Sequence, residues 1–410
     1  MVPRRIDAEW LRGGAAQKLL GILDRDGEEA RVVGGAVRNV LLGVPVSEID
    51  LATTAEPSEV TRRAGGAGFK VVPTGIDHGT VTVVIDGSPF EVTTLRQDVE
   101  TYGRHAKVAF GRDWKADAQR RDFTINALSA SKDGMVHDYV GGLADLDARR
   151  VRFIGDAGQR IAEDYLRVLR FFRFHAAYGE GPLDKDSLHA CIMARNDLAQ
   201  LSRERVRMEI MKLLVARNAS GVLQAMADCG ILGLLLAGVP NAVNFTAMAA
   251  AETALAMPAD PVRRLAALAV LVAEDAERLW QKLRLSNAEY TRLLSMGQAW
   301  WRRIVPAGDE LARPWLYRLG AEAFTDRVLL AWSRWGASAD DPDWHKLATL
   351  PLRWPVPSFP IKAADLMERG VAKGPALGAA LSAAEAAWIE AGFPDDKARL
   401  DAIADAAAKR

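Results

Sequence analysis

Apolar and polar positions alternate along the first third of the chain, whereas the remainder has the wider apolar spacing of amphipathic helices. Strands are predicted over residues 69–73, 79–86 and 90–96, with Asp86-Gly87 as a hairpin turn. From residue 151 onward helices dominate, including one predicted helix over 160–177. The pattern predicts an α+β protein whose small mixed sheet is followed by all-α segments.

The stretch VVGGAVRNVLLGVPVSEIDLATT, residues 32–54, carries the first candidate chemistry. A strand carrying Glu48, Ile49 and Asp50 is predicted here, and side chains alternate between the faces of a strand. Glu48 and Asp50 would therefore share one face, about 6–7 Å apart. Such carboxylates repel each other unless a cation lies between them, and Mg²⁺ prefers one or two carboxylates together with substrate phosphates.

A glycine pair just before these acids suggests a phosphate site. Gly34 and Gly35 end an apolar strand and precede a predicted helix over residues 36–42. The turn would let a phosphate approach the backbone, where the first N–H groups of the helix are unsatisfied. Arg38, one turn into the helix, would add charge-assisted bonds. The acid pair alone fits an ordinary surface strand, and the glycine pair alone fits an ordinary turn. Together, the acid pair and the glycine turn favour nucleotidyl transfer.

Composition narrows the setting. The chain has 410 residues, 49% hydrophobic and 26% charged, with a formal net charge of zero. This length predicts several domains, and any nucleic-acid surface must be a local basic patch. Two cysteines suit a reducing compartment. The polar first segment and the lack of a long apolar run predict a cytoplasmic protein that is neither exported nor membrane-spanning.

Several motifs occur in a fixed order. They are GGAVRN with LLG, EIDLATTA, RRDFTINAL (120–128), GGLADLDARRVRFIGD (141–156), EDYLRVLRFFRF (163–174) and ERVRMEIMKLL (204–214). This series resembles the bacterial-type (class II) CCA-adding enzyme and poly(A) polymerase family, closely over about residues 30–215 and weakly afterwards. The resemblance implies a nucleotidyltransferase head at 1–150, a base-recognising, RNA-binding neck at 151–235, and a helical body at 236–340 and tail at 341–410.

The resemblance also assigns roles in the head. Glu48 and Asp50 match the metal-binding acids, and Glu91 matches a third catalytic carboxylate, although an isolated strand acid is more often surface decoration. In RRDFTINAL the first two residues would bind the triphosphate, whereas the aspartate and asparagine would bind the ribose: Arg120, Arg121, Asp122 and Asn126. The aperiodic residues 97–113 predict a mobile loop, which resembles the family's loop for switching from C to A addition.

Two positions depart from the family pattern. Position 48 is Glu and position 39 is Asn, where the family ordinarily has Asp at both. Glu48 can still bind Mg²⁺, but its extra methylene moves the carboxylate by about 1 Å, and misplacement on that scale costs roughly 100-fold in rate.

A further predicted site would read the base. Asp164 and Arg167 match the EDxxR pattern and would be neighbours on the predicted helix 160–177, with Arg170 on the same polar face. An ionised Asp only accepts hydrogen bonds and Arg only donates them. Such a pair suits cytosine and adenine, which both present an amino donor beside a ring-nitrogen acceptor. The alternative is a surface ion pair of about 0–1 kcal/mol.

Basic and aromatic residues alternate over 278–303, including Arg302 and Arg303. This pattern fits RNA binding and a helix with buried tryptophans equally well. The leading prediction is a template-independent tRNA nucleotidyltransferase that adds or repairs the 3′-terminal CCA, using Mg²⁺, CTP and ATP on the tRNA acceptor arm. Alternatives are a poly(A) polymerase, an enzyme that adds only CC or only A, and a catalytically impaired RNA-binding protein, which Glu48 favours.

Overall fold

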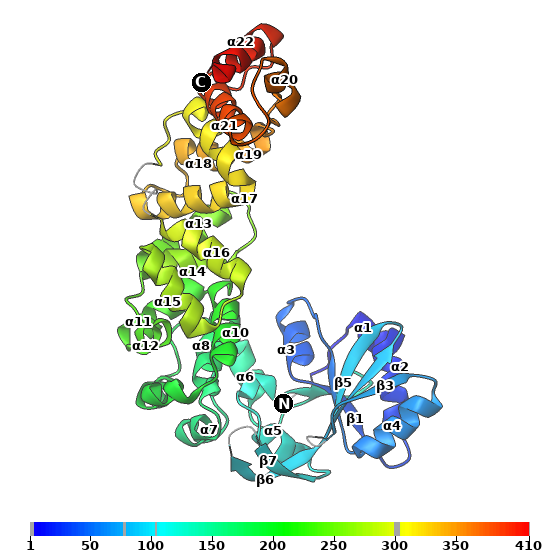
Figure 1. Cartoon of the computed structure of the whole chain (residues 1–410). Helices are drawn as coiled ribbons and strands as arrows, with labels where there is room; N and C mark the ends of the chain where they lie inside the picture. The colour runs from blue at the N-terminus through cyan, green and yellow to red at the C-terminus, as the bar shows by residue number, and fades with distance from the viewer. Residues whose placement is uncertain (1–3, 77–78, 103–104, 299–303, 410) are drawn as a thin grey trace. The chain divides into compact units, whose positions relative to one another are not determined.

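The structure is a computed structural model that describes residues 4–409, apart from 77–78, 103–104 and 299–303; for residues 97–109 the description covers the backbone. The chain divides into two compact units, Met1–Leu235 and Leu236–Arg410 (Figure 1). The first unit contains a sheet and helices, and the described part of the second is helical. The α+β prediction is therefore confirmed.

The main sheet of the first unit has seven strands in the order β3-β4-β5-β2-β1-β8-β9. The strands are β1 (Ala30–Val33), β2 (Asp50–Thr53), β3 (Lys70–Gly75), β4 (Thr80–Ile85), β5 (Ser88–Thr94), β8 (Ser129–Ala130) and β9 (Val136–His137). β2 and β5 are parallel, whereas the other pairs are antiparallel, so the sheet is mixed as predicted.

Local sequence signals explain these elements. At the β4–β5 hairpin, Asp86 and Gly87 have φ angles of 51° and 80°, and such positive values at both turn residues are those of a type I′ turn. Pro57 starts α4 (Pro57–Gly66), where its missing N–H is not needed. This helix contacts α2 (Gly14–Leu23), which lies beside it in Figure 1. α2 buries Leu19, Leu20 and Leu23 completely. α1 (Glu9–Arg12) precedes α2.

The prediction of an irregular loop over residues 97–113 is wrong in its secondary structure, whereas the predicted mobility stays a prediction. β6 (Arg96–Tyr102) and β7 (His105–Phe110) form a separate antiparallel two-stranded sheet, followed by α5 (Trp114–Gln119). The register shifts between Asp98 and Glu100. An irregularity of this kind interrupts the two-residue alternation that identifies a strand in a sequence.

The prediction of one continuous helix over 160–177 is also wrong, because the structure has two helices in this region. α7 (Ala157–Glu163) ends at Asp164, whose φ of −156° and ψ of 105° are extended, and α8 (Leu166–Tyr178) begins two residues later. The Asp164 carboxylate accepts a hydrogen bond from the Leu166 backbone N–H at 3.1 Å. Short polar side chains compete with helical hydrogen bonds in this way.

The remaining helices complete both units. In and at the end of the first unit they are α3 (Gly35–Leu42), α6 (Gly142–Asp147), α9 (Lys185–Met193), α10 (Arg203–Leu214), α11 (Ala219–Asp228) and α12 (Ile231–Leu236). The second unit has α13 (Ala242–Ala254), α14 (Pro261–Ala269), α15 (Ala273–Leu283), α16 (Asn287–Gly297), α17 (Asp309–Trp335), α18 (Pro342–Ala348), α19 (Leu350–Arg353), α20 (Ala363–Glu368), α21 (Pro375–Glu390) and α22 (Lys397–Ala408). Across the described residues, no helix combines the length and apolar character needed to cross a membrane.

Candidate active site

The site residues predicted within the first unit line a single pocket of about 670 Å³. They are Gly34, Gly35, Arg38, Glu48, Asp50, Glu91, Arg120, Arg121, Asp122, Asn126, Asp164, Arg167 and Arg170. Segments more than a hundred residues apart in sequence therefore contribute to one cavity. The other two predicted residues, Arg302 and Arg303, lie outside the described residues.

Sheet register explains how two of the acids come together. In the parallel pair of β2 and β5, Leu51 lies beside Val92. Asp50 and Glu91 each precede this pair by one residue, so both project from the same face of neighbouring strands. Glu48 also lines the pocket, but it precedes β2 rather than lying in it. The predicted strand over residues 48–50 is thus wrong in extent, and alternation along a strand does not place Glu48.

The electrostatics of the three acids favour a cation. Although Asp50 reaches solvent, the surrounding protein raises its pKa, and the negative charges of Glu91 and Glu48 raise it further, while Arg121 opposes them. Among the described residues, no group of three or more His, Cys, Asp or Glu side chains is already arranged to hold a metal ion. Two carboxylates on neighbouring strands, together with substrate phosphates, are a ligand set that Mg²⁺ takes in proteins.

The glycine turn has the geometry expected for a phosphate site. Gly34 has a φ of 66°, a conformation that favours glycine. A Cβ atom added here would lie 3.3 Å from Nη1 of Arg121 and 3.5 Å from the carbonyl oxygen of Asn126. α3 begins at Gly35, so the turn joins β1 directly to a helix N-terminus at the pocket.

Arg38 is buried and already engaged by the protein. Its guanidinium donates to Asn126 Oδ1 at 2.5 Å, to Asn39 Oδ1 at 2.8 Å and to the Tyr178 hydroxyl at 2.8 Å. It also lies 3.9 Å from the centre of the Tyr178 ring. Arg38 therefore connects α3 to the end of α8, and Asn39, at one of the two atypical positions, helps to hold it.

The two arginines predicted to bind triphosphate share one buried acid. Asp117, from α5, accepts hydrogen bonds from Arg120 at 2.5 and 2.9 Å and from Arg121 at 3.1 and 3.3 Å. Sequence reasoning missed Asp117, although a spacing of three and four residues from the arginines is the spacing of neighbours on a helix and was a usable signal. Three further pocket-lining residues were missed because nothing local marks them: Thr80, Thr93 and Arg96. Phe174 and Arg205 also line the pocket, and each lies within one of the ordered motifs.

Asp122 and Asn126, predicted to bind ribose, are largely buried in a polar network. Asp122 accepts from Asn126 Nδ2 at 3.0 Å, from the Phe123 backbone N–H at 2.9 Å and from Arg170 at 2.6 Å. Burial acts to raise the pKa of Asp122, but the charge of Arg170 and these hydrogen bonds lower it overall. The carboxylate is therefore held in its ionised form.

The predicted base-reading residues are not paired with each other. Asp164 forms a salt bridge with Arg205 at 2.6 Å, and Arg167 pairs with Glu163 while donating to the Arg160 carbonyl oxygen at 2.7 Å. The helix predicted to carry both residues breaks at Asp164, but the two remain neighbours, because the Arg167 backbone N–H donates to the Asp164 carbonyl oxygen at 2.9 Å. Both side chains still line the pocket. Arg167 can donate hydrogen bonds there, and the Asp164 carboxylate can accept them.

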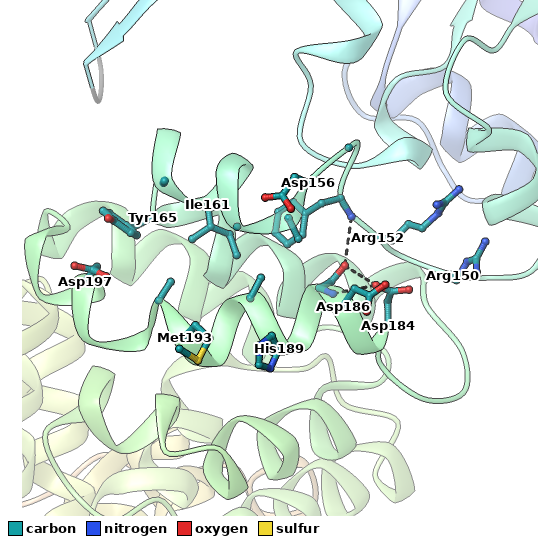
Figure 2. Close-up of a pocket in the computed structure, with 18 residues that line it drawn as sticks. Arg150, Arg152, Asp156, Ile161, Tyr165, Asp184, Asp186, His189, Met193 and Asp197 are labelled. Atoms are coloured by element: carbon teal, nitrogen blue, oxygen red, sulfur yellow. Dashed lines mark hydrogen bonds between the residues drawn. The ribbon is translucent and has the colours of Figure 1, made fainter.

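A second cavity of about 760 Å³ lies between α7 and α9 (Figure 2). Its walls include Arg150, Arg152, Asp184, His189 and Met193. None of the predicted site residues belongs to this cavity, so its larger volume does not make it the candidate for the chemistry.

Fold and pocket together define a class of enzyme: a nucleotidyltransferase in which a small mixed sheet presents acids beside a glycine turn. Comparison with protein families agrees, because residues 30–152 match the "Poly A polymerase head domain". Residues 182–242 match the "Probable RNA and SrmB- binding site of polymerase A".

Individual relatives narrow this class. CCA tRNA nucleotidyltransferase 1, mitochondrial, from Mus musculus is 33% identical over 388 residues, covering 94% of this chain and 88% of that protein. A CCA-adding enzyme from Limosilactobacillus fermentum is 31% identical, covering 93% and 94%. The crystal structure of the Bacillus stearothermophilus CCA-adding enzyme with CTP superposes with a TM-score of 0.75, at 28% identity and 97% coverage of both chains. The chain belongs to the CCA-adding enzyme family.

Proposed function

We propose that this protein completes or repairs the 3′-terminal CCA of tRNA, using CTP and ATP and no nucleic-acid template. One observation carries the proposal: a single pocket is lined by the three acids, the glycine turn, the arginines and the two base-reading candidates. The relatives supply the substrate, since one is named a CCA tRNA nucleotidyltransferase and another a CCA-adding enzyme.

Each part of the pocket has a place in the reaction. The Gly34-Gly35 turn, Arg120 and Arg121 would bind the triphosphate, with Arg38 stiffening the turn. Asp122 and Asn126 would face the ribose. The RNA 3′-hydroxyl attacks the α-phosphate and pyrophosphate leaves. Glu48 and Asp50, with Glu91 nearby, would hold a divalent metal, proposed as Mg²⁺, whose chemistry is to lower the pKa of that hydroxyl.

Asp164 and Arg167 would select the base. One accepts and the other donates, which matches the amino and ring-nitrogen edge shared by cytosine and adenine. In the free protein their partners are Arg205 and Glu163, respectively. Base binding would therefore exchange these ion pairs for contacts to the nucleotide, and the pocket can serve both C and A with the same two side chains.

A second candidate is a related enzyme that makes poly(A), or that adds only CC or only A, since these share the head motifs. A third is a catalytically impaired RNA-binding protein, favoured by the longer acid at position 48. One experiment separates the three. The protein is incubated with tRNA lacking CCA, Mg²⁺ and the nucleoside triphosphates singly and together, and the RNA 3′ ends are sequenced.

Addition that stops after C-C-A supports the proposal. Long A tails, or products that stop at CC or carry only A, support the second candidate. Retention of RNA with no added nucleotide supports the third.

The remaining predictions stand as parts of this proposal. The neck at 151–235, body at 236–340 and tail at 341–410 would hold the tRNA acceptor arm by shape, with the head at 1–150. Arg302 and Arg303 would contact its phosphates. The two cysteines, Cys191 and Cys229, are both free, which suits the cytoplasm as the proposed compartment.

A further inference from the structure

Asp117 is a buried acid next to the pocket that the proposed reaction does not use. Its side chain is 4% exposed, and it lies on α5, three residues before Arg120 and four before Arg121. One carboxylate oxygen accepts both hydrogen bonds from Arg120 and the other accepts both from Arg121. A single carboxylate therefore orients two guanidinium groups, each by two hydrogen bonds.

The two arginines differ from Asp117 in where they lie. Both line the nucleotide pocket, with side chains 20% and 22% exposed, whereas Asp117 does not line it. Nη1 of Arg121 is 3.3 Å from the position that a Cβ of Gly34 would occupy, so this guanidinium lies directly against the glycine turn. The same guanidinium donates to the Asn126 carbonyl oxygen at 3.4 Å. Arg121 is thus fixed from both sides at the phosphate turn.

Two guanidinium groups held side by side repel each other, and a flexible arginine loses side-chain entropy when a ligand immobilises it. The Asp117 carboxylate offsets both costs before any nucleotide arrives. We propose that Asp117 is a positioning residue for triphosphate recognition: it holds Arg121 at the Gly34-Gly35 turn and Arg120 in the same pocket, and thereby makes the pocket favour nucleoside triphosphates over monophosphates. This inference rests on the proposed function, because it assumes that the turn receives the triphosphate.

Asp145 provides a matched control. It is completely buried and also holds two arginines, Arg150 at 2.5 Å and Arg152 at 2.6 Å, in addition to the Thr124 hydroxyl at 2.7 Å. Neither of these arginines lines the nucleotide pocket, and both lie at the other cavity (Figure 2). Asp145→Asn therefore removes an equivalent buried charge without touching the proposed triphosphate site.

The test measures the affinities of the full-length protein for CTP and CMP by isothermal titration, with Mg²⁺ and without RNA. The CTP-to-CMP affinity ratio isolates the contribution of the β- and γ-phosphates. Asp117→Asn should lower this ratio about tenfold, equivalent to about 1.4 kcal/mol. Asp117→Glu, which keeps the charge, should recover most of it. Asp145→Asn should leave the ratio unchanged while lowering the thermal unfolding midpoint.

An unchanged or increased ratio in folded Asp117→Asn overturns the inference, because the carboxylate would then be structural or would merely reduce the positive charge. Should Asp117→Asn not fold, the change is placed in an Arg120→Gln, Arg121→Gln background, where the buried acid has lost its partners. If Asp117 acts through the arginines, it alters the ratio no further there, and an additional drop contradicts the inference.

The CTP-to-CMP ratio does not depend on which nucleotides are added to RNA. A wild-type protein that prefers CTP but never makes CCA would contradict the proposed function and leave the role of Asp117 standing. A wild-type protein with no preference for CTP over CMP would overturn the role of Asp117.

Discussion

A charged network in the second unit and the acid cluster in the pocket of the first unit treat ionised side chains in opposite ways. In the second unit, buried acids are matched with arginines: Asp326 binds Arg263 and Arg292 at 2.9 Å, and Glu252 binds Arg263 at 2.9 Å and Arg264 at 2.7 Å. Burial acts to lower the pKa of Arg292, but the hydrogen bonds and charges of Asp326 and Asp260 raise it. Charge here is balanced within the protein.

In the pocket that holds the predicted site residues, by contrast, three acids act on one another: Asp50 and Glu91 project from neighbouring strands, and Glu48 precedes β2. Among the described residues, Glu48, Asp50 and Glu91 form no salt bridge with a cation, and their mutual repulsion contributes to the raised pKa of Asp50. A balanced network stabilises a fold, whereas an unbalanced one is completed by a ligand of opposite charge. The difference indicates which charged cluster is structural and which is a binding site.

The largest expected effect follows from removing an unbalanced acid. Asp50→Ala should lower kcat for nucleotide addition by at least about a thousandfold, because a bound metal contributes several kcal/mol to the transition state. Its unfolding midpoint without metal should stay the same or rise, because like-charge repulsion is relieved. Activity assays at saturating Mg²⁺ and NTP, with thermal unfolding in parallel, check both. Activity that survives the change would remove Asp50 from the site.

Removing an acid that is paired with arginines should instead lower the stability of the fold and leave kcat unchanged. Asp326→Ala leaves Arg263 and Arg292 without one buried partner, which typically costs about 3–5 kcal/mol in the free energy of unfolding. Urea unfolding measures this loss, and kcat for the folded fraction at low temperature should match that of the wild type. A variant as stable as the wild type would show that the network in the second unit is not structural.

The contrast also explains what could be predicted from the sequence. Glycines, acids and arginines in ordered motifs identified the pocket residues in the first unit, since each motif is local. The break at Asp164 was not predicted because a polar residue at that position also fits the exposed face of a continuous helix. Similarly, the register shift near Asp98 interrupts the alternation of side chains, so the sequence pattern indicated a loop where the structure has a hairpin. The partners Arg205 and Tyr178 depend on packing between distant segments, which local patterns do not record.

Asp164 shares features with both kinds of acid: it lines the pocket, and it also forms a salt bridge with Arg205. If it reads the base, Asp164→Ala should raise the KM for CTP and ATP and reduce discrimination against UTP and GTP by about 10- to 100-fold, the range for a lost bidentate contact of about 1–3 kcal/mol. Competition assays with mixed nucleotides measure this selectivity. Unaltered selectivity in a folded variant would assign the pair with Arg205 to structure alone.

Replacing Arg302 and Arg303 tests whether the second unit also has charged side chains, here positive, that are completed by a ligand. If both contact RNA phosphates, replacing them with Gln should weaken tRNA binding and reduce the slope of log K against log salt concentration by about one unit per lost contact. Filter binding over a range of KCl concentrations measures the slope. An unaltered slope would mean that these arginines do not contact the RNA backbone.

The smallest expected effect concerns the length of one unbalanced acid. Glu48→Asp should leave kcat unchanged or increase it, because the shorter side chain withdraws the carboxylate by about 1 Å toward the position implied by the rest of the motif. Charge is preserved, so the unfolding midpoint should change little. The comparison needs kcat and the Mg²⁺ concentration for half-maximal rate in the wild type and the variant. A large fall in kcat would show that the pocket is built around glutamate, with Glu48 reaching the metal from outside β2, where the structure places it.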